Sequence, residues 1–466
     1  MNENKVQELQ DVVIRFSGDS GDGMQLTGTL FSDTSALLGN GISTFPDYPA
    51  EIRAPQGTVA GVSGFQVHFG AKRQLNPGDF CDVLIAMNPA ALKANRKWLK
   101  PGATVILDED SITEEHLRKA GFATLDPIRE LNLEDFNVVV PNITEMTKAA
   151  LADSGLDNKA MVKCKNMFAL GICFYLYNRP EDHAKRYLDS KFAKKNPAIA
   201  EANKRAIDAG YNYAANTHQF ANTYTVASGQ MEKGTYRSIS GNVATAWGLC
   251  AASEKSGLPL FCGSYPITPA TVILEELAKR KDLGVKTVQA EDEIAGICTA
   301  IGASFAGNFA VTTTSGPGLS LKSEALGLAV MTELPLVVVD VQRGGPSTGL
   351  PTKTEQSDLQ QALYGRNGES PVAVIAASMP SDCFHYAFEA GRIAMEHMTP
   401  VVLLSDGFIA NGSEPWKIPS MKDYPTINPP IIDKTEDGGP FMPYARNEKL
   451  ARSWAFPGKA GLEHRV

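Results

Sequence analysis

The 466-residue sequence lacks any Cys-x-x-Cys pair, although it contains seven cysteines, at positions 81, 164, 173, 250, 262, 298 and 383. Their odd number and wide spacing argue against a disulfide framework and against a thiolate metal cage. No run of residues approaches the roughly 20 apolar residues that span a bilayer, and the N-terminus is polar. These absences predict a cytoplasmic protein with free thiols and no membrane segment.

The sequence contains fewer basic than acidic residues. Lys and Arg number 44 against 52 Asp and Glu, which gives a formal net charge of -8. Nucleic-acid binding draws on concentrated Lys and Arg, so this balance argues against a nucleic-acid partner. The histidines share no metal-ligand spacing and no nucleophile-elbow serine accompanies them. We therefore expect this chain to hold no metal of its own and no hydrolase triad.

The order of the apolar runs predicts two α/β domains. In the first half, β-rich runs alternate with helical periodicity, which favours a largely parallel sheet. The strands expected there are 12–16, 82–86, 103–107 and 137–140, with helices at 26–38 and 161–177. The Lys and Glu spacing of the charged segment 179–204 also suits a solvated helix. The second block predicts a doubly wound sheet. Its expected strands are 258–262, 286–289, 309–312, 336–340, 372–375 and 400–404, with helices at 243–255, 272–281 and 293–306.

Composition sets the expected domain boundaries. We expect residues 1–190 to form the first domain and residues 234–430 the second. Residues 191–233 are expected to be a linker, since the stretch from 210 onward is rich in Asn, Tyr, Thr and Ser without apolar periodicity. Residues 431–466 are expected to form an extended Pro-rich segment at the start of a further domain.

An acidic cluster, Glu291-Asp292-Glu293, follows the strand expected at 286–289 and opens a helix. This is the edge where open α/β sheets place ligands. Acidic residues in a first helical turn also complement the helix macrodipole, so position alone leaves a structural role open. Together with the Thr-Ser-Gly-Pro-Gly turn at 314–318, the cluster resembles the pyrimidine-binding domain of thiamine-diphosphate enzymes. The resemblance implies that Glu293, or alternatively Glu291, shares a proton with ring nitrogen N1′ of that cofactor.

Two further segments narrow the resemblance. Residues 265–269, Tyr-Pro-Ile-Thr-Pro, lie between a strand and a helix, where proline is also typical of a plain helix entrance. Residues 342–349, Gln-Arg-Gly-Gly-Pro-Ser-Thr-Gly, follow the strand at 336–340, and an arginine there suits a bidentate grip on a carboxylate. With the acidic cluster, these segments resemble the 2-oxoacid:ferredoxin oxidoreductases, and most closely the 2-oxoglutarate members.

The resemblance also implies roles for individual residues. Thr268 is expected to contact the substrate and Arg343 to bind its 2-oxoacid carboxylate. Arg366, in a loop that resembles the next loop of the same enzymes, is a candidate for the second carboxylate on charge alone. The residues expected beside the cofactor are Tyr265, Pro266, Ile267, Glu293, Ser315 and Gly316.

A glycine-rich turn at 16–23, Phe-Ser-Gly-Asp-Ser-Gly-Asp-Gly, joins the first expected strand to a helix. Its spacing matches neither Gly-x-Gly-x-x-Gly nor a phosphate loop, and a purely structural turn stays open. With residues 51–57, the turn resembles the γ domain of the same oxidoreductases. The resemblance implies that amides at Gly21, Asp22, Gly23 and Met24 receive phosphates of coenzyme A, with Arg53 nearby.

The resemblance covers about residues 10–430 and implies a γ domain fused ahead of an α subunit's pyrimidine domain. A β subunit is expected to supply the diphosphate site with Mg²⁺ and a [4Fe-4S] cluster, in an (αβ)₂ assembly that serves ferredoxin. The expected reaction is oxidative decarboxylation of 2-oxoglutarate with coenzyme A to succinyl-CoA and CO₂, or its reversal. Alternatives are a pyruvate or branched-chain 2-oxoacid enzyme, a non-redox thiamine-dependent decarboxylase, and a non-catalytic assembly subunit.

Overall fold

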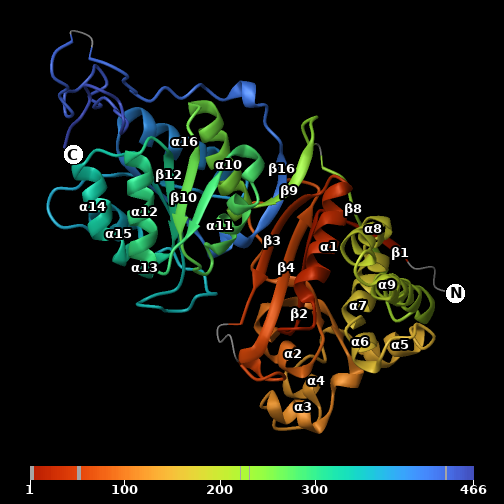
Figure 1. The fold of residues 1–466 in the computed structure, drawn as a ribbon. Coiled ribbons are helices and arrows are strands. Elements are labelled where there is room, and N and C mark those ends of the chain that lie inside the picture. The colour runs from red at the N-terminus through yellow and green to blue at the C-terminus, as the bar shows by residue number, and fades with distance from the viewer. Residues whose placement is uncertain (1–4, 50–53, 221, 230, 436–437, 466) are drawn as a thin grey trace. The chain divides into compact units, whose positions relative to one another are not determined.

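The computed structural model describes residues 5–49, 54–220, 222–229, 231–435 and 438–465. The chain divides into two compact units, Met1–Gly234 and Thr235–Val466 (Figure 1). Each unit has its own six-stranded sheet and its own hydrophobic core, so each is described by itself.

The first unit contains the elements β1 to β8 and α1 to α9. Its strands are β1 (Lys5–Leu9), β2 (Asp11–Asp19), β3 (Gly41–Asp47), β4 (Val62–Gly70), β5 (Cys81–Ala86), β6 (Leu99–Leu107), β7 (Asn137–Val139) and β8 (Asn222–Val226). Its helices are α1 (Met24–Leu37), α2 (Pro89–Asn95), α3 (Glu114–Lys119), α4 (Pro127–Glu130), α5 (Ile143–Ala150), α6 (Asn158–Val162), α7 (Lys165–Leu176), α8 (Asp182–Leu188) and α9 (Pro197–Thr217).

The main sheet of this unit has the strand order β3-β4-β2-β5-β6-β7. Strands β2, β5, β6 and β7 pair in parallel, whereas β4 is antiparallel to both of its neighbours. The mostly parallel sheet predicted from the sequence is therefore confirmed. Strands β3 and β4 were not predicted. In β3, Ser, Thr and Pro interrupt the apolar residues, whereas the alternation from Phe65 to Phe69 in β4 was an available signal.

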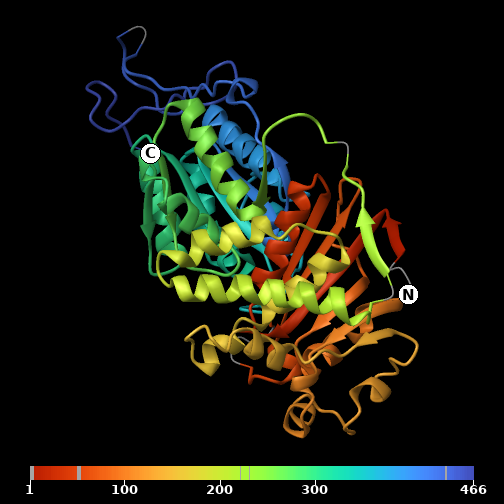
Figure 2. The ribbon, with the colours of Figure 1, turned by 90° about the vertical axis from the view of Figure 1, so that its right-hand side faces the viewer.

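The structure differs from the expected linker over residues 191–233, because the helix α9 occupies residues 197–217 of that segment. This helix packs along α7 (Figure 2), so closely that a Cβ on Gly210 would clash with the carbonyl oxygen of Phe168. Small buried residues recur every four positions on α9, at Ala202, Ala206, Gly210 and Ala214. That spacing places them on one face of a helix, and it indicates a helix that the composition of the segment does not.

The second unit contains the elements β9 to β16 and α10 to α17. Its strands are β9 (Tyr236–Ser240), β10 (Leu260–Ser264), β11 (Lys286–Gln289), β12 (Phe309–Thr314), β13 (Leu336–Gln342), β14 (Ala373–Ala376), β15 (Pro400–Asp406) and β16 (Ser413–Lys417). Its helices are α10 (Gly241–Ser256), α11 (Thr271–Ala278), α12 (Glu293–Phe305), α13 (Gly316–Leu321), α14 (Ser323–Met331), α15 (Leu359–Tyr364), α16 (Asp382–His397) and α17 (Gly407–Asn411).

The main sheet of the second unit is parallel throughout, with the strand order β11-β10-β12-β13-β15-β14. Helices α12 and α14 cover one face, and α10 and α16 cover the other (Figure 1). Every residue of β12, β13 and β15 is buried, as expected for strands covered on both faces. The doubly wound fold predicted for this part of the chain is confirmed.

Residues 431–435 and 438–465 pack against the core and helices of the second unit. Trp454 is fully buried in the core that α10 and α16 share, and it forms a bridge with Ile431. The ring of Phe456 packs against Gly307, at the end of the turn after α12, and Arg446 pairs with Glu333. The Pro-rich composition thus predicted the irregular backbone but not its packing. Among the helices that the structure describes, none combines the length and apolar character that a bilayer crossing requires.

Candidate active site

The predicted motifs of the second unit gather at the carboxyl edge of its sheet. Tyr265 follows the end of β10, Ser315 follows β12, and Arg343 follows β13. Glu293 opens α12, shortly after β11 ends. Because parallel strands end at the same edge, segments that lie up to 78 positions apart in the sequence meet there.

The three carboxylates of the acidic cluster, Glu291, Asp292 and Glu293, lie in different environments. Asp292 caps α12, since its side chain accepts a hydrogen bond of 2.8 Å from the Ala295 amide. Glu291 is exposed to solvent, whereas Glu293 is half-buried in the first turn of the helix. The capping role that acidic residues offered is therefore filled by Asp292, which leaves the Glu293 carboxyl available for chemistry.

Gly318 marks the point where three side chains converge. A Cβ placed on it would clash with Oγ1 of Thr314, lie 2.5 Å from the Tyr265 hydroxyl and lie 2.9 Å from Cγ of Glu293. The second glycine of the Ser-Gly-Pro-Gly turn is therefore required by this packing, because no other residue leaves room for the neighbouring side chains.

Tyr265 connects the first motif to this convergence point. Its hydroxyl lies 3.2 Å from Oγ1 of Thr314. Burial raises the pKa of the Tyr265 phenol, and hydrogen bonding to the Glu293 carboxyl and the charge of that carboxyl raise it further. Of the other predicted residues in the motif, Ile267 is half-buried, while Pro266 and Thr268 are exposed.

Arg343 joins the third motif to the first. Its guanidinium donates to the carbonyl oxygens of Thr268, at 2.7 Å, and Thr348, at 2.9 Å. Nε of Arg343 and Oγ of Ser315 are buried without a hydrogen-bond partner in the part of the chain that the structure describes. Such unsatisfied polar atoms are rare in folded proteins and are expected where a ligand completes the site.

Comparison with known proteins identifies the family. A family model described as pyruvate flavodoxin/ferredoxin oxidoreductase, thiamine diphosphate-binding, matches residues 254–466, and one described as pyruvate ferredoxin/flavodoxin oxidoreductase matches residues 13–213. The 2-oxoglutarate oxidoreductase subunit KorA of Mycobacterium tuberculosis is 55% identical over 461 residues, which are 99% of this chain and 70% of that protein. The chain belongs to the 2-oxoacid:ferredoxin oxidoreductase family.

Other members of the family extend this result. The 2-oxoglutarate synthase subunit KorA of Archaeoglobus fulgidus is 39% identical over 46% of this chain and 64% of its own length. The solved 2-oxoglutarate:ferredoxin oxidoreductase of Magnetococcus marinus, described with 2-oxoglutarate, coenzyme A and succinyl-CoA bound, superposes with a TM-score of 0.81 at 34% identity. That match covers 98% of this chain and 73% of the solved chain.

The contacts of Arg366 within its own segment were not predicted from the sequence. Its guanidinium donates to the carbonyl oxygens of Ala362 and Leu363, in the last turns of α15, and of Ser370. These are the contacts of a helix cap, which satisfies carbonyl groups that a helix end leaves free. A role of Arg366 in substrate binding stays a prediction.

The site also contains a pair of acids that no motif predicted. Asp340 on β13 is fully buried, and a Cβ on Gly316 would lie 2.6 Å from the carboxyl of Asp358. Burial raises the pKa of both carboxyl groups, and the charge of Asp358 raises that of Asp340 further. We infer one shared proton, held mainly by Asp340. The position of Asp340 among the valines of β13 was the signal that the sequence offered for this pair.

The glycine-rich turn of the first unit is lined by carboxylates. Asp22 accepts a hydrogen bond of 2.9 Å from the Asp19 amide and lies 3.3 Å from Nζ of Lys165. Gly23 adopts a left-handed conformation, with φ 75°, directly before Met24 opens α1. The helix start has no side-chain cap, which suits an anion, but Asp19 and Asp22 oppose one. Gly21 is exposed, and the predicted Arg53 lies outside the described residues.

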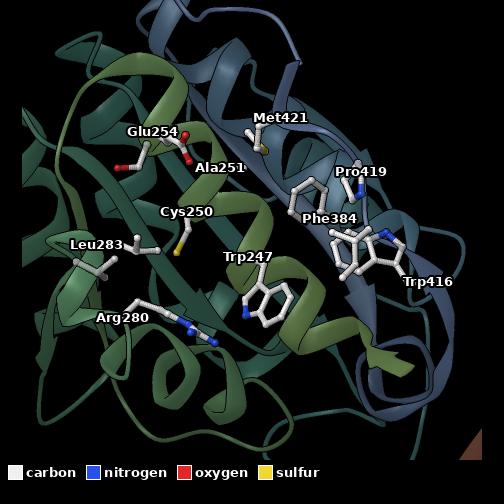
Figure 3. A pocket seen from close by; sticks show the side chains of 13 residues that line it. Trp247, Cys250, Ala251, Glu254, Arg280, Leu283, Phe384, Trp416, Pro419 and Met421 are labelled. Atoms are coloured by element: carbon white, nitrogen blue, oxygen red, sulfur yellow. The ribbon is translucent and has the colours of Figure 1, made fainter. Parts of the chain in front are cut away.

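A separate apolar cavity lies on the outer side of α10. It has a volume of about 460 Å³ and is lined by Trp247, Phe384 and Trp416 among others (Figure 3). None of the predicted site residues lines it.

Among the described residues, no cluster of three or more His, Cys, Asp or Glu side chains could hold a metal ion.

Proposed function

We propose that this chain is the fused γα subunit of a 2-oxoglutarate:ferredoxin oxidoreductase. The reaction is oxidative decarboxylation of 2-oxoglutarate with coenzyme A to succinyl-CoA and CO₂, with electrons passing to ferredoxin, or the reverse reductive carboxylation. The convergence of Glu293, Tyr265 and Thr314 at Gly318, beside Arg343, carries this proposal. Relatives named for 2-oxoglutarate support the choice of substrate.

Glu293 is the residue proposed to meet the pyrimidine ring of thiamine diphosphate. When bound, this cofactor supplies a carbon nucleophile and an electron sink for decarboxylation. A carboxyl group that is half-buried beside the Tyr265 phenol can share a proton with ring nitrogen N1′. Ser315 and Gly316, together with Pro266 and Ile267, are proposed to line the same pocket.

Arg343 and Thr268 are proposed to bind the 2-oxoacid. The contacts of Arg343 with two carbonyl oxygens fix the plane of its guanidinium and leave three of its five N–H groups free, Nε among them. A 2-oxoacid carboxylate can then accept a charge-assisted hydrogen bond from an arginine that is already oriented. The exposed Thr268 offers its hydroxyl next to this guanidinium.

A β subunit is proposed to complete the site with the diphosphate-binding residues, Mg²⁺ and a [4Fe-4S] cluster, in an (αβ)₂ assembly. The names of the relatives describe them as subunits, which supports a multi-chain enzyme. Helices that border Glu293 also expose large apolar side chains, namely Ile294, Leu321, Leu328 and Met331. Exposed apolar surface next to half of a cofactor site is typical of a partner interface.

The first unit is proposed to be the γ domain, which associates with coenzyme A. Its match to the second family model, over residues 13–213, supports this assignment. The uncapped start of α1 after Gly23 offers amides to a phosphate, and Lys165 lies beside that turn.

The proposed function is tested by reconstituting the complex and measuring the reduction of ferredoxin or a viologen dye with 2-oxoglutarate, pyruvate and branched-chain 2-oxoacids. We expect 2-oxoglutarate to give the highest kcat/KM. A clear preference for another 2-oxoacid would refute the substrate assignment. Glu293→Gln is expected to lower kcat by about 100-fold or more, since it removes the proton-sharing group. Unchanged turnover in this variant would favour a non-catalytic subunit.

A further inference from the structure

Lys322 is a fully buried lysine that connects α13 to α14. Its Nζ donates hydrogen bonds to the carbonyl oxygen of Glu293, at 2.6 Å, and to Oγ1 of Thr312, at 3.2 Å. The ring of Tyr265 lies 5.2 Å from the same nitrogen. In the part of the chain that the structure describes, no carboxylate oxygen lies within 4.0 Å of this ammonium. Lysines are almost never buried without an ion pair, so this one needs an explanation.

The position of Lys322 places it under the first turn of α12. Besides the bond to the Glu293 carbonyl, its Nζ lies 3.5 Å from the point that a Cβ on Gly296 would occupy. The ammonium therefore connects three segments that form the site: the start of α12, strand β12 through Thr312, and the residue after β10, Tyr265. A shift of Lys322 would change where Glu293 stands relative to the sheet edge.

The charge of Lys322 also acts on this site. Burial lowers the pKa of Lys322 to about 8, and the negative charge of Glu293 opposes that change by favouring the ammonium. The other titratable groups that act on it are Cys262 on β10, and Asp292 and Cys298 on α12. At neutral pH the side chain is mainly protonated, so a buried positive charge faces the carboxylate proposed to meet the cofactor.

We propose that Lys322 is a positioning residue for Glu293, which fixes the first turn of α12 through the Glu293 carbonyl and supplies, in addition to the buried Arg343, a buried positive charge that faces the Glu293 carboxylate. This inference rests on the proposed function, because it gives Lys322 a task only if Glu293 meets the pyrimidine ring. The hydrogen bond from Lys322 to the Glu293 carbonyl fixes the position of the Glu293 carboxyl group. The charge sets how firmly a proton is held between that carboxyl and N1′, because a nearby cation weakens proton binding.

The test compares two cofactors in the purified complex. Thiamine diphosphate and its analogue with CH in place of N1′ are titrated, and the ratio of their dissociation constants measures the hydrogen bond between Glu293 and N1′. A hydrogen bond that involves a charged group predicts a ratio of about 10 to 100 in the wild type. Turnover is not part of this readout, so a defect in electron transfer leaves it unchanged.

Two substitutions separate the effect of the hydrogen bond to the Glu293 carbonyl from the effect of the charge of Lys322. Lys322→Met removes both the donor and the charge, and we expect the ratio to fall to less than about a third of the wild-type value. Lys322→Gln keeps a donor for the carbonyl and is expected to retain most of the ratio. Both variants should hold the shared proton to higher pH, so the pH at which the ratio declines moves upward in each. Replacing a buried cation with Met is expected to leave the fold intact, which the thermal midpoint checks.

Controls make each outcome decisive. Lys286→Met, at an exposed position of the edge strand β11, should change neither the ratio nor its pH dependence. A background of Cys298→Ser removes an exposed thiol whose charge acts on Lys322. If Glu293→Gln abolishes the ratio and Lys322→Met leaves the ratio and its pH dependence unchanged, the role of Lys322 is refuted. If Glu293→Gln keeps the full ratio, the proposed function fails first.

Discussion

Gly318 and Glu293 belong to different helices, α13 and α12, yet a Cβ on Gly318 would lie 2.9 Å from Cγ of Glu293. The same Cβ would clash with Oγ1 of Thr314. This close approach leaves the Glu293 side chain little freedom at the end where its carboxyl group must be placed. Restricting a reacting group in advance lowers the entropic cost of reaching the reactive geometry.

Gly318→Ala is therefore expected to displace Glu293 or Tyr265. Overpacking of this kind costs about 1–3 kcal/mol of stability, and we expect the affinity for thiamine diphosphate to fall by about tenfold or more. Cofactor titration and thermal unfolding of the purified complex measure both effects. The matched control is Gly327→Ala on α14, where a Cβ would meet nothing within 4 Å. It should leave cofactor affinity unchanged and stabilise the helix. Equal affinities in both variants would contradict the packing argument.

Arg343→Lys is expected to raise the KM for 2-oxoglutarate by about tenfold or more, because lysine keeps the charge but loses the planar donor set. The carbonyl contacts with Thr268 and Thr348 would be lost as well. Arg366→Lys is the matched variant, and its helix-cap contacts predict a lower thermal midpoint with KM within about twofold of the wild type. A loss of selectivity for 2-oxoglutarate over pyruvate in the Arg366 variant would instead support binding of the second carboxylate.

Asp340→Asn is expected to flatten the dependence of stability on pH. Burial raises the pKa of Asp340 well above its ordinary value of 3.8, so the folded protein keeps a proton that the unfolded chain releases. The contribution of Asp340 to the free energy of unfolding is then greatest below about pH 4, and it falls as the pH rises toward the folded-state pKa. The variant lacks this proton, and its amide can still donate to Asp358.

The thermal midpoint between pH 5 and pH 8 measures this effect. The midpoint of the wild type should fall relative to that of Asp340→Asn as the pH rises. Glu291→Gln, at an exposed carboxyl near the same edge, is expected to follow the wild type. Parallel curves for the wild type and Asp340→Asn would show that no proton is retained between Asp340 and Asp358.

Asp22→Asn is expected to lower the KM for coenzyme A several-fold, by about two- to fivefold. The substitution removes a negative charge from the turn before α1 and frees Lys165, which lies 3.3 Å from Asp22, to meet a phosphate. Asparagine can still accept the hydrogen bond from the Asp19 amide. Steady-state kinetics with varied coenzyme A measure the change, with the KM for the 2-oxoacid as an internal control. A raised KM for coenzyme A would place its phosphates elsewhere.

Much of the fold follows from local sequence. The apolar runs at 309–312, 336–340 and 400–404 predicted strands, and the structure confirms them as parts of β12, β13 and β15. Strand β3 was missed because polar residues and a proline interrupt its apolar pattern, whereas β4 was missed although Phe65 to Phe69 alternate apolar and polar residues. The part of helix α9 beyond residue 204 was missed because its buried face is built largely from alanine and glycine, which carry little hydrophobic signal.

The sequence by itself determined that the motifs around Tyr265, Glu293 and Arg343 meet, since each follows a strand of a parallel sheet and such strands end at one edge. Only the tertiary structure decided that Asp292 caps the helix and leaves Glu293 available. It also decided that Lys322 supports Glu293 from below, across 29 positions of the chain. Periodicity records which face of an element is buried, but the partner that fills the space depends on packing between distant segments.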